Sequence, residues 1–236
     1  MFSLIKKKTV KAFLEGIPER LRPTINYCTT DMWEGYINAI DEFINENDDV
    51  TASPVVDRFH VAQNYRDDFD DLRKKELRRL KKELPPATYE DDCKGLLWPL
   101  RKNHSALNPD ERQALRRLFA HSPALHRAYT FREELTAIFN QKLSVDKAEH
   151  RLQAWIRKVE RSSLDNFDGF LKTLRNHFQH IVNYFAHRIT SGFVEGLNNK
   201  IKVITRRCYG IRNVSTLFQR IWLDLNGKER FSLSTT

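Results

Sequence analysis

The sequence predicts an α/β protein that is predominantly helical. Near the N-terminus a strand, a helix and a second strand follow one another, an order that favours parallel pairing through a crossover. Residues 60–187 then show helical periodicity almost throughout, and a further amphipathic helix follows at 191–207. The 236 residues, 40% hydrophobic and 11% aromatic, are enough for one large domain or two small ones with a real core.

The predicted strands lie in the first sixty residues. Residues 6–16 are predicted to form a short helix that a glycine and a proline end. The β-branched and aromatic stretch 24–30 is predicted to be a strand, and 31–45 the helix that follows it. A short buried strand is expected at 54–56. The inner face of the 31–45 helix is expected to carry Trp33, Tyr36, Ile37, Ile40 and Ile44.

The long helical stretch contains one strongly basic segment and one clear helix start. Residues 71–84 place seven cations among four leucines. This pattern is typical of the solvated face of an amphipathic helix, and a contact with DNA is the alternative. Asn108 followed by Pro109 predicts a capped helix N-terminus.

Charge and cysteine usage narrow the classes of partner and compartment. The 40 lysines and arginines exceed the 31 acids by nine, which favours a polyanionic partner, nucleic acid before membrane. Cys28, Cys93 and Cys208 form no CxxC pair, so a zinc knuckle or disulfide framework is disfavoured and a reducing cytosol is expected. The sequence contains no signal-peptide pattern and no apolar run of transmembrane length, so we expect a soluble, cytoplasmic protein with no membrane partner.

Two aspartates end the two predicted strands. Asp31 and Asp57 therefore occupy the edge at which open α/β sheets bind their ligands. Each also has a purely structural interpretation, since Asp31 can cap a helix beginning at Met32 and Asp57 one beginning near Phe59. His60, three residues after Asp57, forms an Asp-x-x-His pattern that by itself is a weak metal motif.

The 191–207 segment places a single acid among amides and cations. At about 100° per residue, one helix face carries Glu195, Asn198, Asn199, Lys202 and Arg206. The opposite face carries Val194, Leu197, Ile201 and Ile204 and is expected to face a core. Ser191 can cap this helix, and an acid in the first turn favours the helix dipole, so the acid alone does not define a site.

Several kinds of catalytic site are disfavoured. Glycine-rich phosphate loops and a Ser-His-Asp pattern are absent from the sequence, and His177, His180 and His187 are interpreted as ordinary helix residues. Scattered carboxylates beside a basic surface remain. Carboxylates are ligands for hard divalent cations such as Mg²⁺ or Mn²⁺, and basic and amide side chains hold a phosphate backbone.

Three motifs in order, "TTDMWEGYINAI", "VVDRFHVAQNY" and "SGFVEGLNNKIKVITRRCYGIRN", resemble bacterial insertion-sequence transposases of the ISL-three group. The resemblance extends from about Lys8 to Leu225. Members of the group are DDE transposases with an RNase H-like catalytic core. The resemblance implies transposition of an insertion sequence, with divalent metal assisting DNA cleavage and strand transfer.

The resemblance also implies roles for single residues. Asp31 matches the second catalytic aspartate and Glu195 the catalytic glutamate, both as ligands of Mg²⁺ or Mn²⁺. Asp57 and His60 match a supporting Asp-x-x-His motif; in an alternative register Asp57 is the second metal ligand. The residues expected to contact DNA at the element ends and target are Asn198, Asn199, Lys200, Lys202, Arg206, Arg207 and Arg212.

The implied organisation is a core interrupted by a helical insertion. Residues 1–65 are expected to form the N-terminal part of the RNase H-like core, 66–187 the insertion, and 188–236 the C-terminal part with the glutamate helix. The family's first aspartate lies upstream of the point corresponding to Lys8, so we interpret the chain as an N-terminally truncated transposase with an incomplete core, either residually active or inactive because two carboxylates of three should hold a metal poorly. The alternative is a catalytically dead fragment that binds DNA or a partner; the parent enzyme is expected to be a homo-oligomer.

Overall fold

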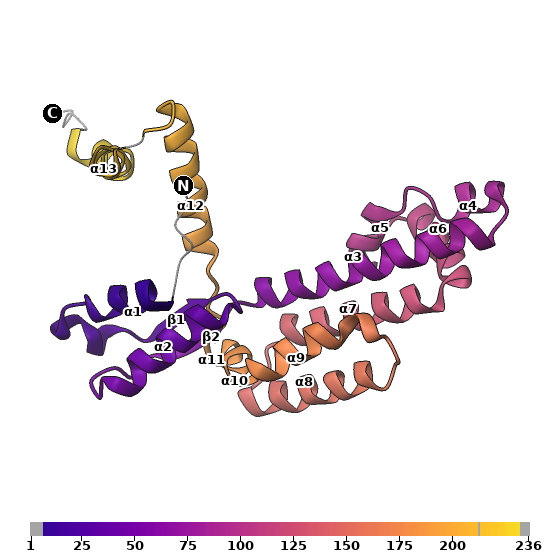
Figure 1. The fold of residues 1–236 in the computed structure, drawn as a ribbon, viewed down its shortest axis with the longest axis horizontal. Coiled ribbons are helices and arrows are strands. Elements are labelled where there is room, and N and C mark those ends of the chain that lie inside the picture. Colours follow the sequence, from indigo (N-terminus) through magenta and orange to yellow (C-terminus); the bar gives the residue numbers. More distant parts are fainter. Residues whose placement is uncertain (1–6, 212, 232–236) are drawn as a thin grey trace. The chain divides into compact units, whose positions relative to one another are not determined.

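The computed structural model describes residues 7–211 and 213–231. The chain forms two compact units, 1–189 and 190–236. Helices make up most of the described residues, and the sheet found among them has two strands (Figure 1). The predicted α/β class with a predominance of helix is therefore confirmed. None of the helices within the described ranges is long and apolar enough to cross a membrane.

The first unit begins with the strand–helix–strand segment. Its elements are α1 (Lys7–Glu15), the 3-10 helix η1 (Glu19–Thr24), β1 (Tyr27–Thr30), α2 (Glu34–Glu46) and β2 (Ser53–Val56). The two strands pair in parallel, as expected for strands joined by a crossover helix. Their register runs from Tyr27 opposite Ser53 to Thr30 opposite Val56, so both strands end level with each other.

Two details of this segment differ from the prediction. Strand β1 starts at Tyr27 rather than residue 24, because Pro23 lies within η1, which ends at Thr24. Helix α2 starts at Glu34 rather than residue 31, and Trp33, expected to face inward, is 41% exposed. A small core forms instead between α1, α2 and the segment before β2 from Leu14, Ile40, Phe43, Val50 and Ala52.

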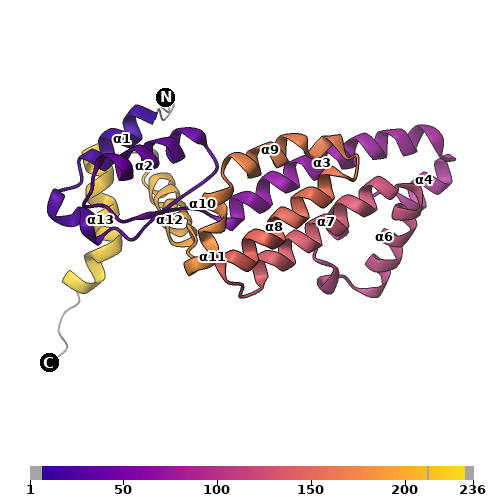
Figure 2. The ribbon, with the colours of Figure 1, turned by 90° about the horizontal axis from the view of Figure 1, so that it is seen from below.

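A helical bundle makes up the rest of the first unit. Its elements are α3 (Arg58–Glu83), α4 (Pro86–Asp92), α5 (Leu97–Arg101), η2 (His104–Ala106), α6 (Pro109–His121), α7 (Pro123–Asn140), α8 (Val145–Glu160), η3 (Asp165–Phe167), α9 (Asp168–Asn176), α10 (Phe178–Val182) and α11 (Tyr184–His187). Helix α3 packs along α7 and α9, and α7 packs along α8 (Figure 2). The helix start predicted at Asn108 is confirmed, with a capping box that Glu111 completes.

Aromatic side chains hold the long helices of the bundle together. The ring of Tyr65 on α3 stacks on that of Phe167, with centroids 4.7 Å apart, and its hydroxyl donates to the carbonyl of Ala128 on α7. Trp155 on α8 donates its indole N–H to the carbonyl of Phe131 on α7 at 3.0 Å. The buried core of the bundle continues to Val55 and Val56, so strand β2 is anchored directly in it.

The described part of the second unit contains two helices, α12 (Gly192–Arg207) and α13 (Val214–Phe231). Between them, Tyr209 and Gly210 both have positive φ, 51° and 74°, so the chain turns sharply after α12. Lys200 on α12 forms an ion pair with Asp224 on α13, with 3.1 Å between Nζ and Oδ2.

Candidate functional site

The carboxyl ends of β1 and β2 bring Asp31 and Asp57 together. Thr30 and Val56 are the last paired residues of the two strands, and an aspartate follows each directly. The backbone N–H of Asp57 donates to the carbonyl oxygen of Thr30 at 3.2 Å, which continues the ladder to the residue before Asp31. The two aspartates therefore leave the sheet side by side at one edge, where parallel α/β sheets place ligands.

The carboxylate of each aspartate accepts a hydrogen bond from the backbone just after it. Oδ1 of Asp31 accepts from the N–H of Trp33 at 3.0 Å, and Oδ1 of Asp57 accepts from the N–H of Phe59 at 2.9 Å. A side-chain oxygen that accepts from the backbone N–H two residues later forms an Asx turn, a conformation that Asp and Asn favour. Asp57 is thereby the N-cap of α3, whereas the N-cap position of α2 is Trp33 and Asp31 lies ahead of it. The capping role considered for Asp57 holds, and the one considered for Asp31 does not.

Exposure distinguishes the two aspartates. Asp57 is only 2% exposed, whereas Asp31 is half-buried. His60 is half-buried in the first turn of α3; its backbone N–H donates to the carbonyl oxygen of Asp57 at 3.0 Å. Asp57 and His60 are thus fixed by the start of a long helix, and Asp31 is the more accessible acid of this edge.

The histidines near the end of the bundle contact α2. Nε2 of His180 lies 3.1 Å from both carboxylate oxygens of Asp41, a residue 139 positions earlier in the chain. His177 is buried, and this burial lowers the pKa of its imidazole below the ordinary value. Within the described part of the first unit, residues 7–189, no three His, Cys, Asp or Glu side chains form a group that could hold a metal ion.

The other predicted carboxylate, Glu195, lies in the first turn of α12. The hydroxyl of Ser191 donates to Oε1 of Glu195 at 3.2 Å, and the N–H of Glu195 donates to the carbonyl of Ser191 at 2.9 Å. Ser191 occupies the N-cap position without a side-chain bond to the backbone, so the expected cap is replaced by a contact with the acid. The convergence of Glu195 with Asp31 stays a prediction.

The polar face predicted on α12 is exposed except at Glu195, which is half-buried. Lys200 pairs with Asp224, as described above, and Arg212 lies outside the described residues. Of the apolar face, Ile204 is buried but Val194 is 50% exposed, so only part of it meets a core within the second unit. The remaining residues predicted to contact DNA all point to solvent: Asn198, Asn199, Lys202, Arg206 and Arg207.

Comparison with known families gives the class of protein first. A family model described as a transposase, that of the ISL3 (ISL-three) group, matches residues 5–221, which include both strand ends and the whole of α12. The chain therefore belongs to the ISL3 family of insertion-sequence transposases.

Curated relatives agree with this family. The transposase for insertion sequence element IS1001 of Bordetella parapertussis is 27% identical over 226 residues, covering 95% of this chain and 53% of that protein. The transposase for IS1557 of Mycobacterium tuberculosis is 28% identical over 134 residues, which are 57% of this chain and 30% of that protein. The chain thus spans about half the length of the first relative, and its match covers less than a third of the second. No solved structure matches it significantly.

Proposed function

We propose that this chain carries carboxylates of the catalytic centre of an insertion-sequence transposase, in which a divalent ion assists DNA cleavage and strand transfer. Asp31 and Glu195 are the proposed ligands. Asp57 and His60 support the edge on which Asp31 lies. The observation that carries the proposal is the pair of adjacent strand ends, Asp31 beside Asp57, in a chain of this family.

Accessibility favours Asp31 over Asp57 as the ligand. A ligand must reach both the ion and the DNA, and Asp31 is half-buried at the edge. Asp57 is buried and its carboxylate caps a helix of 26 residues, so a change in its position would disturb α3. In this proposal Asp57 fixes the end of β2 and thereby the neighbouring end of β1.

The chemistry of the donors fits a hard divalent cation. Carboxylate oxygens are the ligands that Mg²⁺ and Mn²⁺ prefer, and the Asp31 edge together with Glu195 would supply them. Such an ion supplies Lewis-acid activation of a phosphodiester. The Asx turn fixes the carboxylate of Asp31 before any ion binds, because Oδ1 is already held by the N–H of Trp33.

The same proposal includes the fold of the core. A parallel strand pair with a crossover helix is compatible with an RNase H-like core, and the helices between 66 and 187 separate Asp31 from Glu195 as an insertion would. The exposed amides and cations of α12 follow Glu195 on the same helix. They would contact phosphates of the DNA strand near the acid, since backbone phosphates are the main source of DNA affinity.

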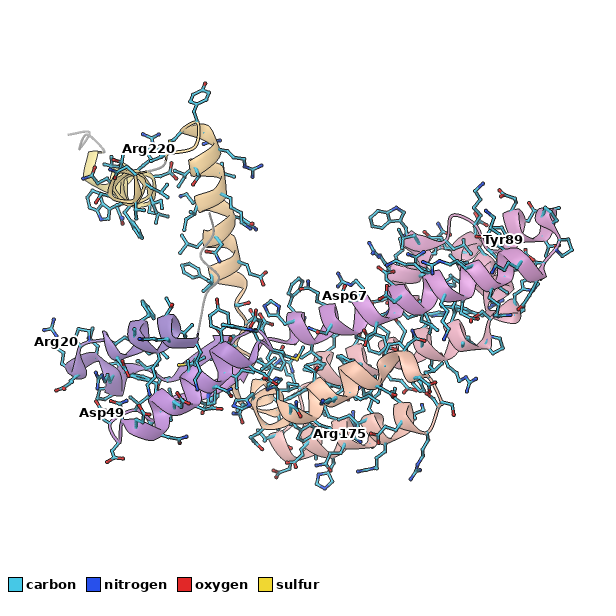
Figure 3. The ribbon with its side chains drawn as sticks, viewed as in Figure 1. Arg20, Asp49, Asp67, Tyr89, Arg175 and Arg220 are labelled. Carbon is cyan, nitrogen blue, oxygen red and sulfur yellow. The ribbon has the colours of Figure 1, made fainter. Side chains whose placement is uncertain are left out.

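Manganese binding tests the proposal directly. The full chain is titrated with Mn²⁺, and binding is followed by the loss of the free-ion EPR signal. Asp31→Asn keeps the acceptor of the Asx turn but removes the charge, so we expect binding to weaken without loss of folding. The matched control is Asp49→Asn, at an exposed position in the loop after α2 (Figure 3). Equal Mn²⁺ affinity of the Asp31→Asn variant and the wild type would rule out Asp31 as a ligand.

A further inference from the structure

The helical bundle contains a cavity that begins one residue after the aspartate edge. Its volume is about 270 Å³, and its walls come from α3, α7 and the segment around the end of α5. Arg58, the residue that follows Asp57, is part of the wall. The cavity lies wholly within the first unit, along the N-terminal part of α3 on which Figure 3 labels Asp67.

The wall of the cavity carries four arginines and no acid. Two of these charges are compensated by acids that do not line the cavity. Arg101 pairs with Asp70 at 2.5 Å, and Arg132 pairs with Glu133 at 2.8 Å. The charges of the other two arginines remain available to a ligand.

Arg58 and Arg66 are the two uncompensated arginines. Arg58 donates only to a neutral group, the amide oxygen of Asn140, at 3.0 Å. Arg66 is exposed, and its guanidinium forms no hydrogen bond or ion pair with any residue in the described part of the chain. The cavity therefore offers two positive charges to an anion.

An accessible aromatic ring lies next to these charges. Tyr65, Phe69 and Phe139 are buried and form the floor, whereas Phe59 is 45% exposed. Phe59 and Arg66 are seven residues apart on α3, so two turns of the helix bring them to the same face. Between them stands Ala62, whose small side chain leaves the space open.

Size and chemistry together define the ligand. A cation pair beside an exposed ring is the combination that binds single-stranded nucleic acid, with phosphate on the cations and a base stacked on the aromatic face. A cavity of about 270 Å³ has the size of a site for one small molecule such as a nucleotide and is too small to enclose a duplex.

We propose that this cavity binds one nucleotide of a single DNA strand, with its phosphate on Arg58 and Arg66 and its base against Phe59. The inference rests on the proposed function, because it takes DNA as the substrate. It adds that DNA beside the Asp31 and Asp57 edge is held as an unpaired strand.

Fluorescence anisotropy of the full chain with a short labelled single-stranded oligonucleotide tests this inference. Arg66→Gln removes one phosphate contact, and Ala62→Leu fills the space, so each should weaken binding about tenfold, the order of one lost stacking or phosphate interaction. Both positions are exposed, so both variants should fold. The matched controls on α3 are Arg78→Gln and Gln63→Leu, exposed positions outside the cavity, and they should bind within about twofold of wild type.

Two further probes separate the alternatives. Unlabelled dAMP should displace the oligonucleotide only weakly; affinity for dAMP equal to that for the strand would overturn the strand assignment in favour of free nucleotide. Wild-type affinity of Arg66→Gln and Ala62→Leu for the single strand would overturn the inference, and so would binding of duplex without binding of single strand.

Failure of the inference is distinguishable from failure of the proposed function. If the variants bind the strand normally while Mn²⁺ binding depends on Asp31, only the cavity is wrongly assigned. If the variants bind the single strand weakly but Mn²⁺ binding is independent of Asp31, the assignment of the cavity holds and the metal proposal fails. Absence of any DNA binding by the wild type would overturn both.

Discussion

Asp31 and Asp57 end neighbouring parallel strands and accept the same hydrogen bond, each from the backbone N–H two residues further along. The two distances are 3.0 and 2.9 Å. The strands end in register, so the two Asx turns lie side by side. Only Asp57 caps a helix directly, and only Asp57 is buried. This difference gives Asp57 a structural role and leaves Asp31 accessible from solvent.

Asp57→Ala should lower the free energy of unfolding by about 1–2 kcal/mol. The N-terminus of α3 would lose the acceptor for the N–H of Phe59, and loss of an N-cap typically costs this much. Asp57→Asn keeps an acceptor oxygen, so it should cost less. Urea unfolding followed by far-UV circular dichroism measures both changes.

The matched control for this prediction is Asp67→Ala, at an exposed position on the same helix. A surface substitution of this kind usually changes stability by less than about 0.5 kcal/mol. If Asp57→Ala and Asp67→Ala destabilise the protein equally, the cap contributes nothing and the assignment of Asp57 to the structure is wrong.

Glu195→Gln should remove any residual metal-dependent nicking of DNA by the chain while DNA binding persists. Glutamine retains an oxygen that can accept from the hydroxyl of Ser191, so α12 should start as before. Loss of partners outside the ligand shell costs about 10–100-fold in activity, so loss of a charged ligand should cost at least about 100-fold. Nicking of supercoiled plasmid with Mn²⁺ and a filter-binding assay measure the two properties.

Glu19→Gln is the control for the nicking prediction, because Glu19 is exposed in η1. It makes the same change of charge and should leave nicking unchanged. A Glu195→Gln variant that nicks at the wild-type rate would remove Glu195 from the proposed centre.

Periodicity predicted the helices well, and local turns decided where the prediction erred. The helix start at Asn108 was predictable because its cap is encoded by adjacent residues. The predicted start of α2 was wrong because the carboxylate of Asp31 accepts from the N–H of Trp33 and the resulting turn delays the helix. This shift leaves Trp33 exposed, and Phe43, which the sequence analysis did not place on the inner face, is fully buried. The coarse α/β class is confirmed; the RNase H-like core, the insertion and the boundaries at 65 and 187 stay predictions.

The candidate site was predictable where it depends on strand ends. Asp31 and Asp57 each end a β-branched stretch, so their meeting follows from parallel pairing. The contact between Asp41 and His180 was missed, because no sequence pattern joins residues 139 positions apart. The cavity was missed for the same reason, since Arg58 meets Asn140 on another helix only through the packing of α3 on α7.

Ser122→Ala should destabilise the bundle by about 1–3 kcal/mol. Ser122 is fully buried at the N-cap of α7, and its hydroxyl donates to Oε2 of Glu76 on α3 at 2.6 Å. The substitution removes the cap and leaves a buried carboxylate with one donor fewer. Urea unfolding measures the effect, and Ser105→Ala at an exposed position is the control. A loss below about 0.5 kcal/mol for Ser122→Ala would show that water replaces the hydroxyl without cost.

Stability should fall as the pH drops below about 6.5, in part because of His177. Burial lowers the pKa of His177 in the folded protein, an effect that the charge of His180 reinforces and that Glu34 and Asp41 partly offset. Above the ordinary histidine pKa of about 6.5, both the folded and unfolded states hold a neutral imidazole, so His177 adds no pH dependence. Below it, the unfolded chain binds a proton that the folded state resists, which favours unfolding.

The pH dependence of urea midpoints in wild type and His177→Gln measures this contribution. One proton difference changes the free energy of unfolding by at most about 1.4 kcal/mol per pH unit, so the slope below the histidine pKa should flatten in His177→Gln by no more than this. His150→Gln, at an exposed position on α8, should keep the wild-type slope. Because the comparison uses slopes, any uniform loss of stability in the buried variant does not affect it. Identical slopes for wild type and His177→Gln would show that the imidazole titrates alike in both states.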